Sequence, residues 1–244
     1  MFGYYYDPTY ILVFIGAIIC MVASSRVNST YRKYAKVRAR SGMTGAEAAE
    51  RILRMSGIND VQIQHVAGDL TDHYDPSKKV LRLSDSVYGS RSVAAIGVAA
   101  HECGHALQHK EGYLPIKIRS MLVPAANLGS KLGLPLVILG LVLGFSFTLP
   151  GGGYFSLAQL GIWIFSLAVL FQIVTLPVEF NASGRALKML GSYGIMNEDE
   201  VDDCKHVLGA AALTYVAAAA SSILQLLRLI LLAGNRRRDD YKRD

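Results

Sequence analysis

Long apolar runs separate the chain into membrane-sized and polar stretches. Apolar positions dominate residues 9–25, 121–148 and 155–177, and a further run over 206–233 begins Ala-rich and turns Leu-rich. A helix rises 1.5 Å per residue, so about 20 apolar residues cross the hydrocarbon core of a bilayer. The pattern therefore predicts a mainly α-helical integral membrane protein with three or four transmembrane helices.

The last run is compatible with two arrangements. If it spans the membrane, the order of spans places the basic residues Arg236, Arg237 and Arg238 outside, against the positive-inside rule. If it does not span, it forms a helix pair on the cytosolic side. Arg228 lies within the run, and an arginine in lipid is costly. We therefore slightly favour the helix pair.

Residues 42–116 have the mixed polar pattern of a soluble domain. Thr44 followed by Glu47 is a capping box, which predicts a helix over about 45–56 that ends at Gly57.

Three short strands are predicted in the same region. Residues 61–66 alternate in the strand manner, and Asp75-Pro76 is a turn signal flanked by strands near 71–74 and 79–84. We expect a small β element, with 79–84 as an edge strand to which an extended substrate could add by β-augmentation.

These patterns divide the chain into four parts. Residues 1–25 form an N-terminal transmembrane anchor with its N-terminus outside, and 26–120 form a cytosolic part. Residues 121–177 form a transmembrane hairpin joined by a tight turn at Pro150–Gly153. Residues 178–244 re-enter the cytosolic side and include the last apolar run and a basic tail.

Composition and charge support this division. Hydrophobic residues make up 52% of the chain and charged residues 18%, fewer than the quarter typical of soluble domains. The net charge of +6 arises from basic residues that follow the first apolar run and from the C-terminus, which indicates topology and not nucleic-acid binding. A signal peptide would carry Lys or Arg before its apolar run, and residues 1–8 contain neither. The three cysteines form no CxxC pair, consistent with a reducing compartment.

The segment after Ser92 predicts a helix that carries the sequence HECGH. His101 and His105 lie four residues apart, so both imidazoles project from one face and can bind one Zn²⁺. Glu102 is adjacent and can act as general base on a water molecule. Two histidines and a glutamate also occur by chance on ordinary helices, but the small residues before the motif and Gly104 within it favour the metal site. Cys103 points away from the ligands, and we interpret it as a packing residue.

A third ligand is needed, and Glu179 is the best candidate. It lies where the third apolar run returns to the cytosolic side, and a carboxylate there needs a partner. His109 continues the helical series, but it is a further turn along the axis, so we expect it beside the metal site or on the surface. His65, His73 and His206 remain alternatives, although no motif surrounds them.

The segments HECGHALQH, PVEFNASGRAL and AALTYVAAA resemble the YugP-type neutral zinc metallopeptidases, a group of bacterial membrane proteases. The resemblance covers nearly the whole chain. It implies a zincin-like cytosolic catalytic part, a zinc site formed by His101, Glu102, His105 and Glu179, and a bacterial cell membrane as the location.

The arrangement is also similar to the heat-shock membrane metallopeptidases and the CAAX prenyl endopeptidases. Those families place the glutamate ligand in an ExxxD pattern, but here Ser183 occupies the aspartate position. The carboxylate that orients a ligand histidine must therefore come from elsewhere or be missing. Asn181, Ser183 and Arg185 are candidates for supporting roles, and Tyr215 or Arg185 for the oxyanion donor.

The expected function is a zinc-dependent endopeptidase that acts on membrane or membrane-proximal proteins. Its partners would be a protein or peptide substrate and the lipid bilayer, with a membrane partner protein or a homo-oligomer as further options, and no nucleic acid. A zinc-bearing membrane scaffold with little hydrolysis is the alternative, although the presence of Glu102 argues against it. A channel or transporter is a distant third, because the apolar runs lack a polar pattern for a solute.

Overall fold

The computed structural model describes residues 7–148 and 154–240 and divides into two compact units. The first, the apolar unit, contains Met1–Val22, Ile118–Val174 and Val216–Asp244. The second, the motif unit, contains Ala23–Lys117 and Thr175–Tyr215, and therefore the HECGH sequence. Each unit is assembled from segments that are distant along the chain.

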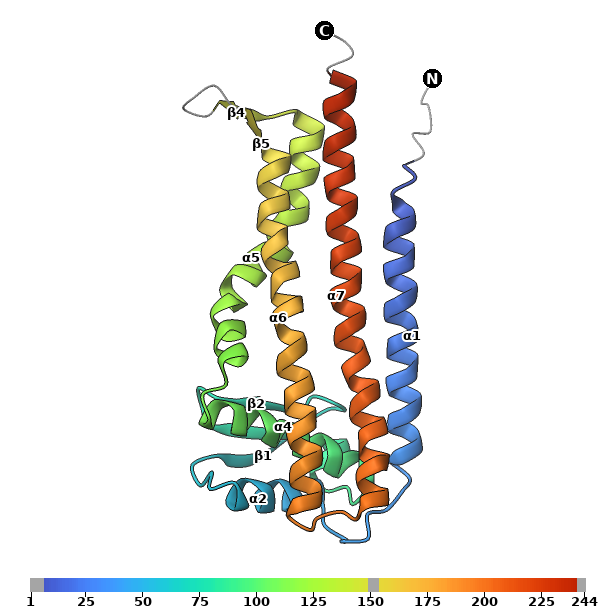
Figure 1. Ribbon diagram of the computed structural model, residues 1–244, viewed down its shortest axis with the longest axis vertical. Coiled ribbons are helices and arrows are strands. Elements are labelled where there is room, and N and C mark those ends of the chain that lie inside the picture. The colour runs from blue at the N-terminus through green and yellow to red at the C-terminus, as the bar shows by residue number, and fades with distance from the viewer. Residues whose placement is uncertain (1–6, 149–153, 241–244) are drawn as a thin grey trace. The chain divides into compact units, whose positions relative to one another are not determined.

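Four helices of the described residues are long and apolar enough to cross a membrane (Figure 1). They are α1 (Tyr10–Tyr34), α5 (Leu114–Leu143), α6 (Leu157–Ser192) and α7 (Glu198–Asp240). This confirms the prediction of a mainly helical membrane protein with a small β element.

Helices α5 and α6 form the predicted hairpin within the apolar unit. Their contact is close, since a Cβ added at Gly161 would lie 2.6 Å from the backbone nitrogen of Val137. Two short antiparallel strands, β4 (Ser146–Thr148) and β5 (Tyr154–Ser156), extend the hairpin and were not predicted. The tight turn predicted at Pro150–Gly153 lies outside the described residues.

The C-terminal apolar run is one continuous helix, so the favoured helix pair is wrong. Helix α7 contains no proline that would break it, and its Ala-rich first half has high helix propensity. The cost of Arg228 is reduced by partners that are distant in sequence. Its Nη2 lies 3.2 Å from Asp7 Oδ2, and its guanidinium stands 4.0 Å from the centre of the Tyr10 ring. Helix α1 lies along α7 here, with the Cys20 Sγ 3.6 Å from the carbonyl oxygen of Ala217.

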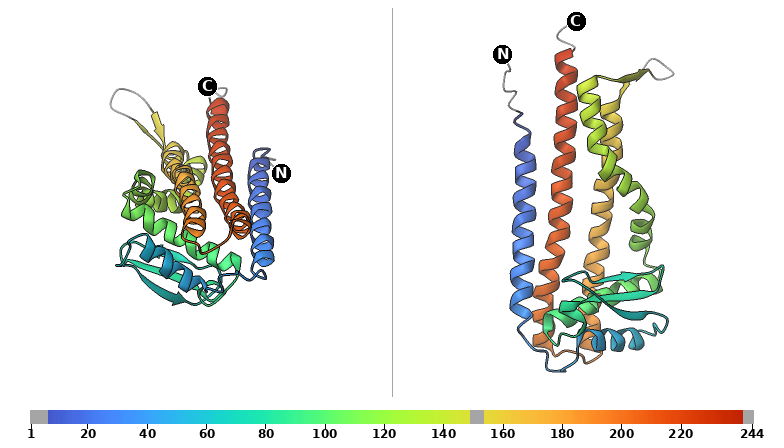
Figure 2. Two further views of the ribbon diagram at one scale, coloured as in Figure 1. Left: turned by 60° about the horizontal axis from the view of Figure 1, so that its bottom comes forward. Right: turned by 180° about the vertical axis from the view of Figure 1, so that it is seen from behind.

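The motif unit combines short helices with a three-stranded sheet (Figure 2). Helix α2 (Gly45–Met55) begins at the predicted Thr44–Glu47 capping box, and Gly57 follows its end with a positive φ of 67°. The strands are β1 (Gln62–Val66), β2 (His73–Asp75) and β3 (Val80–Ser84), followed by helices α3 (Asp85–Tyr88) and α4 (Val93–Lys110). All three strands were predicted near these positions.

The pairing within this sheet differs from expectation. The strand order is β1-β3-β2, with β1 parallel and β2 antiparallel to β3. The segment 79–84 is therefore the central strand and not an edge, and both its neighbouring positions are occupied. Leu81 and Leu83 are fully buried, which explains why this strand lies in the middle. Addition of a substrate strand to β3 is thereby excluded.

Helix α6 continues past Pro177 to Ser192. The continuation carries the PVEFNASGRAL segment into the motif unit as a helix.

Candidate metal centre

Helix α4 presents the two motif histidines side by side. Ser92 caps the helix, its Oγ accepting a hydrogen bond from the Ala95 N–H at 3.2 Å. His101 and His105 follow one turn apart, with ring centroids 4.8 Å apart and ring planes nearly perpendicular. The structure therefore places the two imidazoles as the i, i+4 spacing predicts.

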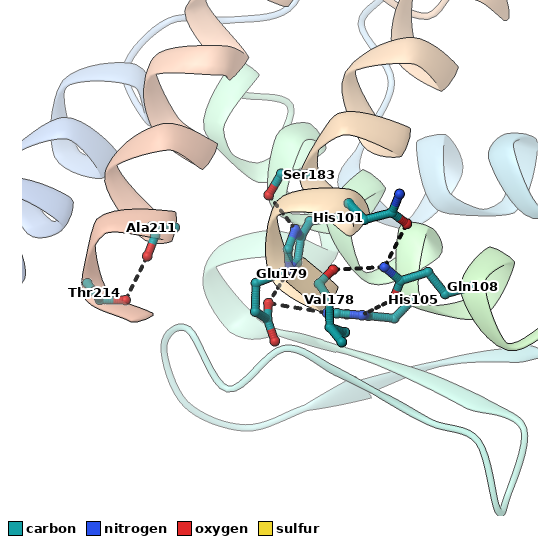
Figure 3. A network of polar contacts seen from close by, with 9 residues as sticks. His101, His105, Gln108, Val178, Glu179, Ser183, Ala211 and Thr214 are labelled. Carbon is teal, nitrogen blue, oxygen red and sulfur yellow. Dashed lines mark hydrogen bonds and ion pairs between the residues drawn. The ribbon is translucent and has the colours of Figure 1, made fainter. Parts of the chain in front are cut away.

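Glu179 projects from α6 between these two rings (Figure 3). Its Oε2 lies 3.2 Å from His101 Nε2 and 3.5 Å from His105 Nε2. Among the described residues these three form the one His/Cys/Asp/Glu group whose candidate ligand atoms all lie within 4.8 Å of one another. Glu179 is only 3% exposed, so its carboxylate is buried against two imidazoles. Two imidazoles and one carboxylate are the donor set of a catalytic zinc site with a fourth position left open.

Gly104 allows the two helices to approach closely enough for this arrangement. A Cβ at this position would lie 2.5 Å from the carbonyl oxygen of Ala182 on α6. The absence of a side chain at Gly104 therefore makes room for the backbone of α6.

The outer nitrogen of each histidine faces a neutral polar group. His101 Nδ1 lies 3.1 Å from the hydroxyl of Ser183, and His105 Nδ1–H donates to the Oε1 of Gln108 at 3.0 Å. Both Nε2 atoms consequently face Glu179. The carboxylate expected from the ExxxD pattern is thus replaced at these two imidazoles by a hydroxyl and an amide.

Gln108 contacts a ligand candidate and was not singled out from the sequence. It is fully buried, and its amide nitrogen donates to the Val178 carbonyl at 2.8 Å and to Asn181 Oδ1 at 2.9 Å. Its position three residues after His105 places it on the same face of α4, and this local signal could have identified it.

Glu102 lies on α4 beside the first ligand candidate and is 9% exposed. Within the part of the chain that the structure describes, its carboxylate makes no side-chain hydrogen bond. Because no other side chain engages its oxygens, this carboxylate is available to accept a proton from a water molecule.

The electrostatics of the site stabilise the protonated form of His105. Burial lowers the pKa of His105, but the hydrogen bond that its ring donates to Glu179 and the charges of Glu102 and Glu179 outweigh this effect. The pKa of His105 is therefore raised above its usual value. A divalent cation would meet the same negative surroundings as this proton.

The other histidines have different partners. The His109 ring packs against Tyr74 at 5.7 Å between centroids, and His206 stacks on Tyr34 at 6.2 Å. His65 contacts Asp85 at 2.6 Å, and His73 contacts Arg82 at 3.1 Å. They do not join the group formed with Glu179.

The structure also shows the surroundings of Cys103 and of the two candidate oxyanion donors. Cys103 is 1% exposed with its Sγ 3.7 Å from the Ala49 carbonyl oxygen, and burial raises its pKa, as fits a packing residue. Arg185, a candidate oxyanion donor, instead pairs with Glu111 at 2.6 Å and donates to Asn181. Tyr215, the other candidate donor, is half-buried on α7.

Comparisons with known proteins agree with this chemistry. Residues 9–234 match the model of a family described as "Putative neutral zinc metallopeptidase". The chain is 50% identical over 196 residues to the "Putative membrane protease YugP" of Bacillus subtilis (strain 168), an alignment that covers 80% of this chain and 83% of that protein. No solved structure matches.

Proposed function

Because the chain belongs to this neutral zinc metallopeptidase family, we propose that it is a membrane-embedded endopeptidase with zinc held by His101, His105 and Glu179. One observation carries the proposal. A buried carboxylate from α6 lies against the Nε2 atoms of two histidines of α4, although 78 residues separate Glu179 from His101 in the sequence. A cation bound between these three side chains would balance the charge of the buried carboxylate.

Each residue of the site has a defined task in peptide hydrolysis. Zinc, when bound, polarises the scissile carbonyl and lowers the pKa of water. Glu102 accepts the proton of the attacking water and then delivers it to the nitrogen of the leaving amine. His101, His105 and Glu179 hold the cation, while Ser183 and Gln108 orient the imidazoles.

The proposal includes a location in the bacterial plasma membrane, with the motif unit in the cytosol. Of the 25 lysines and arginines, 17 lie in residues 26–117 and 178–205, the polar stretches that contain the HECGH motif and Glu179. The positive-inside rule assigns the more basic side to the cytosol. The substrates are then membrane proteins or proteins close to the cytosolic surface of the bilayer.

Exchange of the general base tests the proposed chemistry. Glu102→Gln in detergent-purified, zinc-loaded protein should retain its zinc and lose at least about 100-fold in the rate of hydrolysis of an unfolded protein, since general base catalysis contributes about that much or more. Glu50→Gln, on the exposed face of α2, is the matched control and should keep the wild-type rate. If wild type binds zinc but Glu102→Gln hydrolyses as fast as wild type, the proposed role of Glu102 is wrong.

A further inference from the structure

Gln108 connects the two helices that carry the proposed ligands. On α4 its Oε1 accepts a hydrogen bond from His105 Nδ1–H at 3.0 Å. Toward α6 its amide nitrogen donates to the carbonyl oxygen of Val178, the residue before Glu179, at 2.8 Å. One fully buried amide thus contacts one ligand candidate directly and the backbone adjoining another.

The orientation of this amide is determined by its neighbours on α6. A backbone carbonyl can only accept a hydrogen bond, so Val178 requires the NH₂ group of Gln108. The second neighbour is Asn181 Oδ1, which lies 2.9 Å from the same amide nitrogen. Both contacts therefore need the amide nitrogen on the α6 side, which leaves the amide oxygen for His105.

The Asn181 side chain is itself fixed by Arg185. The Arg185 Nε–H donates to Asn181 Oδ1 at 2.7 Å, so this atom must be the oxygen of the asparagine amide. Arg185 is held in turn by Glu111, whose Oε2 accepts from Nη1 at 2.6 Å, and by the Tyr113 ring at 5.8 Å. A hydrogen-bonded series consequently runs from Glu111 through Arg185, Asn181 and Gln108 to His105.

We propose that Gln108 is a positioning residue that presents the Nε2 of His105 to zinc, and that Asn181 and Arg185 set the orientation of its amide. The amide oxygen of Gln108 can only accept, so the proton of the neutral imidazole is held on Nδ1 and the lone pair remains on Nε2. This inference rests on the proposed function, because it takes His105 as a zinc ligand. The series replaces, with neutral amides, the carboxylate that usually orients a ligand histidine.

Two substitutions of Asn181 separate this role from simple packing. Asn181→Asp keeps an oxygen for both donors, whereas Asn181→Leu keeps the volume and removes the acceptor. The dissociation constant for zinc, measured by competition with a chelator at one pH, should rise about 10- to 100-fold in Asn181→Leu and Gln108→Leu. It should stay within about 3-fold of wild type in Asn181→Asp. A packing role predicts the opposite order, since a carboxylate in a half-buried position would be the more disruptive change.

The absorption spectrum of the Co²⁺-substituted protein provides a second readout. Wild type and Asn181→Asp should share one spectrum, while Gln108→Leu should shift it because the His105 ring is no longer held. Equal zinc affinity in Gln108→Leu and wild type, or an Asn181→Asp as weak as Asn181→Leu, overturns the inference while leaving the proposed function intact. A wild type that binds no zinc overturns both. Thermal melting of each metal-free variant confirms that the protein is folded.

Discussion

The two ring nitrogens of each motif histidine serve different purposes. Nδ1 is engaged by Ser183 or Gln108, and Nε2 faces Glu179. Neutral partners donate less electron density to an imidazole than a carboxylate does. We therefore expect zinc held here to bind less tightly than at a site with a carboxylate–histidine pair, and to remain a strong Lewis acid.

A pH dependence follows from the raised pKa of His105. In the metal-free protein, the His105–Glu179 contact stabilises the fold below the unfolded-state pKa of about 6.5, and this contribution is lost as the pH rises through the raised folded-state value. Zinc binding requires the neutral imidazole, so zinc binds more tightly as the pH rises and His105 loses its proton. The difference in melting temperature between zinc-loaded and chelator-treated protein should therefore increase as the pH rises from about 6 through the raised folded-state pKa of His105.

The matched control for this measurement is His105→Ala, in which the zinc-dependent difference should be small and nearly independent of pH. A wild-type difference that stays constant or shrinks over the interval contradicts the coupling between His105 and the metal.

At the scale of helices, the site depends on how closely α4 approaches α6. Gly104→Ala would place a methyl group 2.5 Å from the Ala182 carbonyl, so the helices must separate. We expect a loss of stability of about 1–3 kcal/mol from overpacking, together with weaker zinc binding. Chemical denaturation and chelator competition measure the two effects.

Gly184→Ala on α6 is a suitable control, because no atom lies within 4 Å of a Cβ added there. It should leave zinc affinity unchanged and be neutral or slightly stabilising, since alanine favours the helix over glycine. Equal behaviour of the two alanine variants would show that the close approach at Gly104 is unimportant.

Local signals in the sequence predicted most elements, and long-range contacts account for the errors. The capping box at Thr44 and the four-residue histidine spacing involve neighbours in sequence, so both could be recognised. The central position of β3 depends on pairing with two other strands, which alternation alone does not reveal. The status of α7 depended on Arg228, whose partner Asp7 is 221 residues away. Gln108 carried a local signal, but its buried role needed the contact with α6.

At the scale of the whole molecule, the proposed orientation can be tested with single cysteines. Ser77 lies in the exposed turn between β2 and β3 of the motif unit, and Ser146 lies in the strand after α5. A membrane-impermeant thiol reagent added to intact cells should label Ser146→Cys and should label Ser77→Cys only after the cells are opened. The reverse pattern would place the motif unit outside the cell.

The central claim is that one zinc ion is held by two histidines of α4 and a glutamate of α6. Elemental analysis of detergent-purified protein tests it most directly, with wild type compared with His105→Ala, Glu179→Ala and the control His109→Ala. We predict about one zinc per chain in wild type and in His109→Ala, and loss of zinc in the other two. Full zinc retention in Glu179→Ala, or its loss in His109→Ala, would contradict the assigned ligand set.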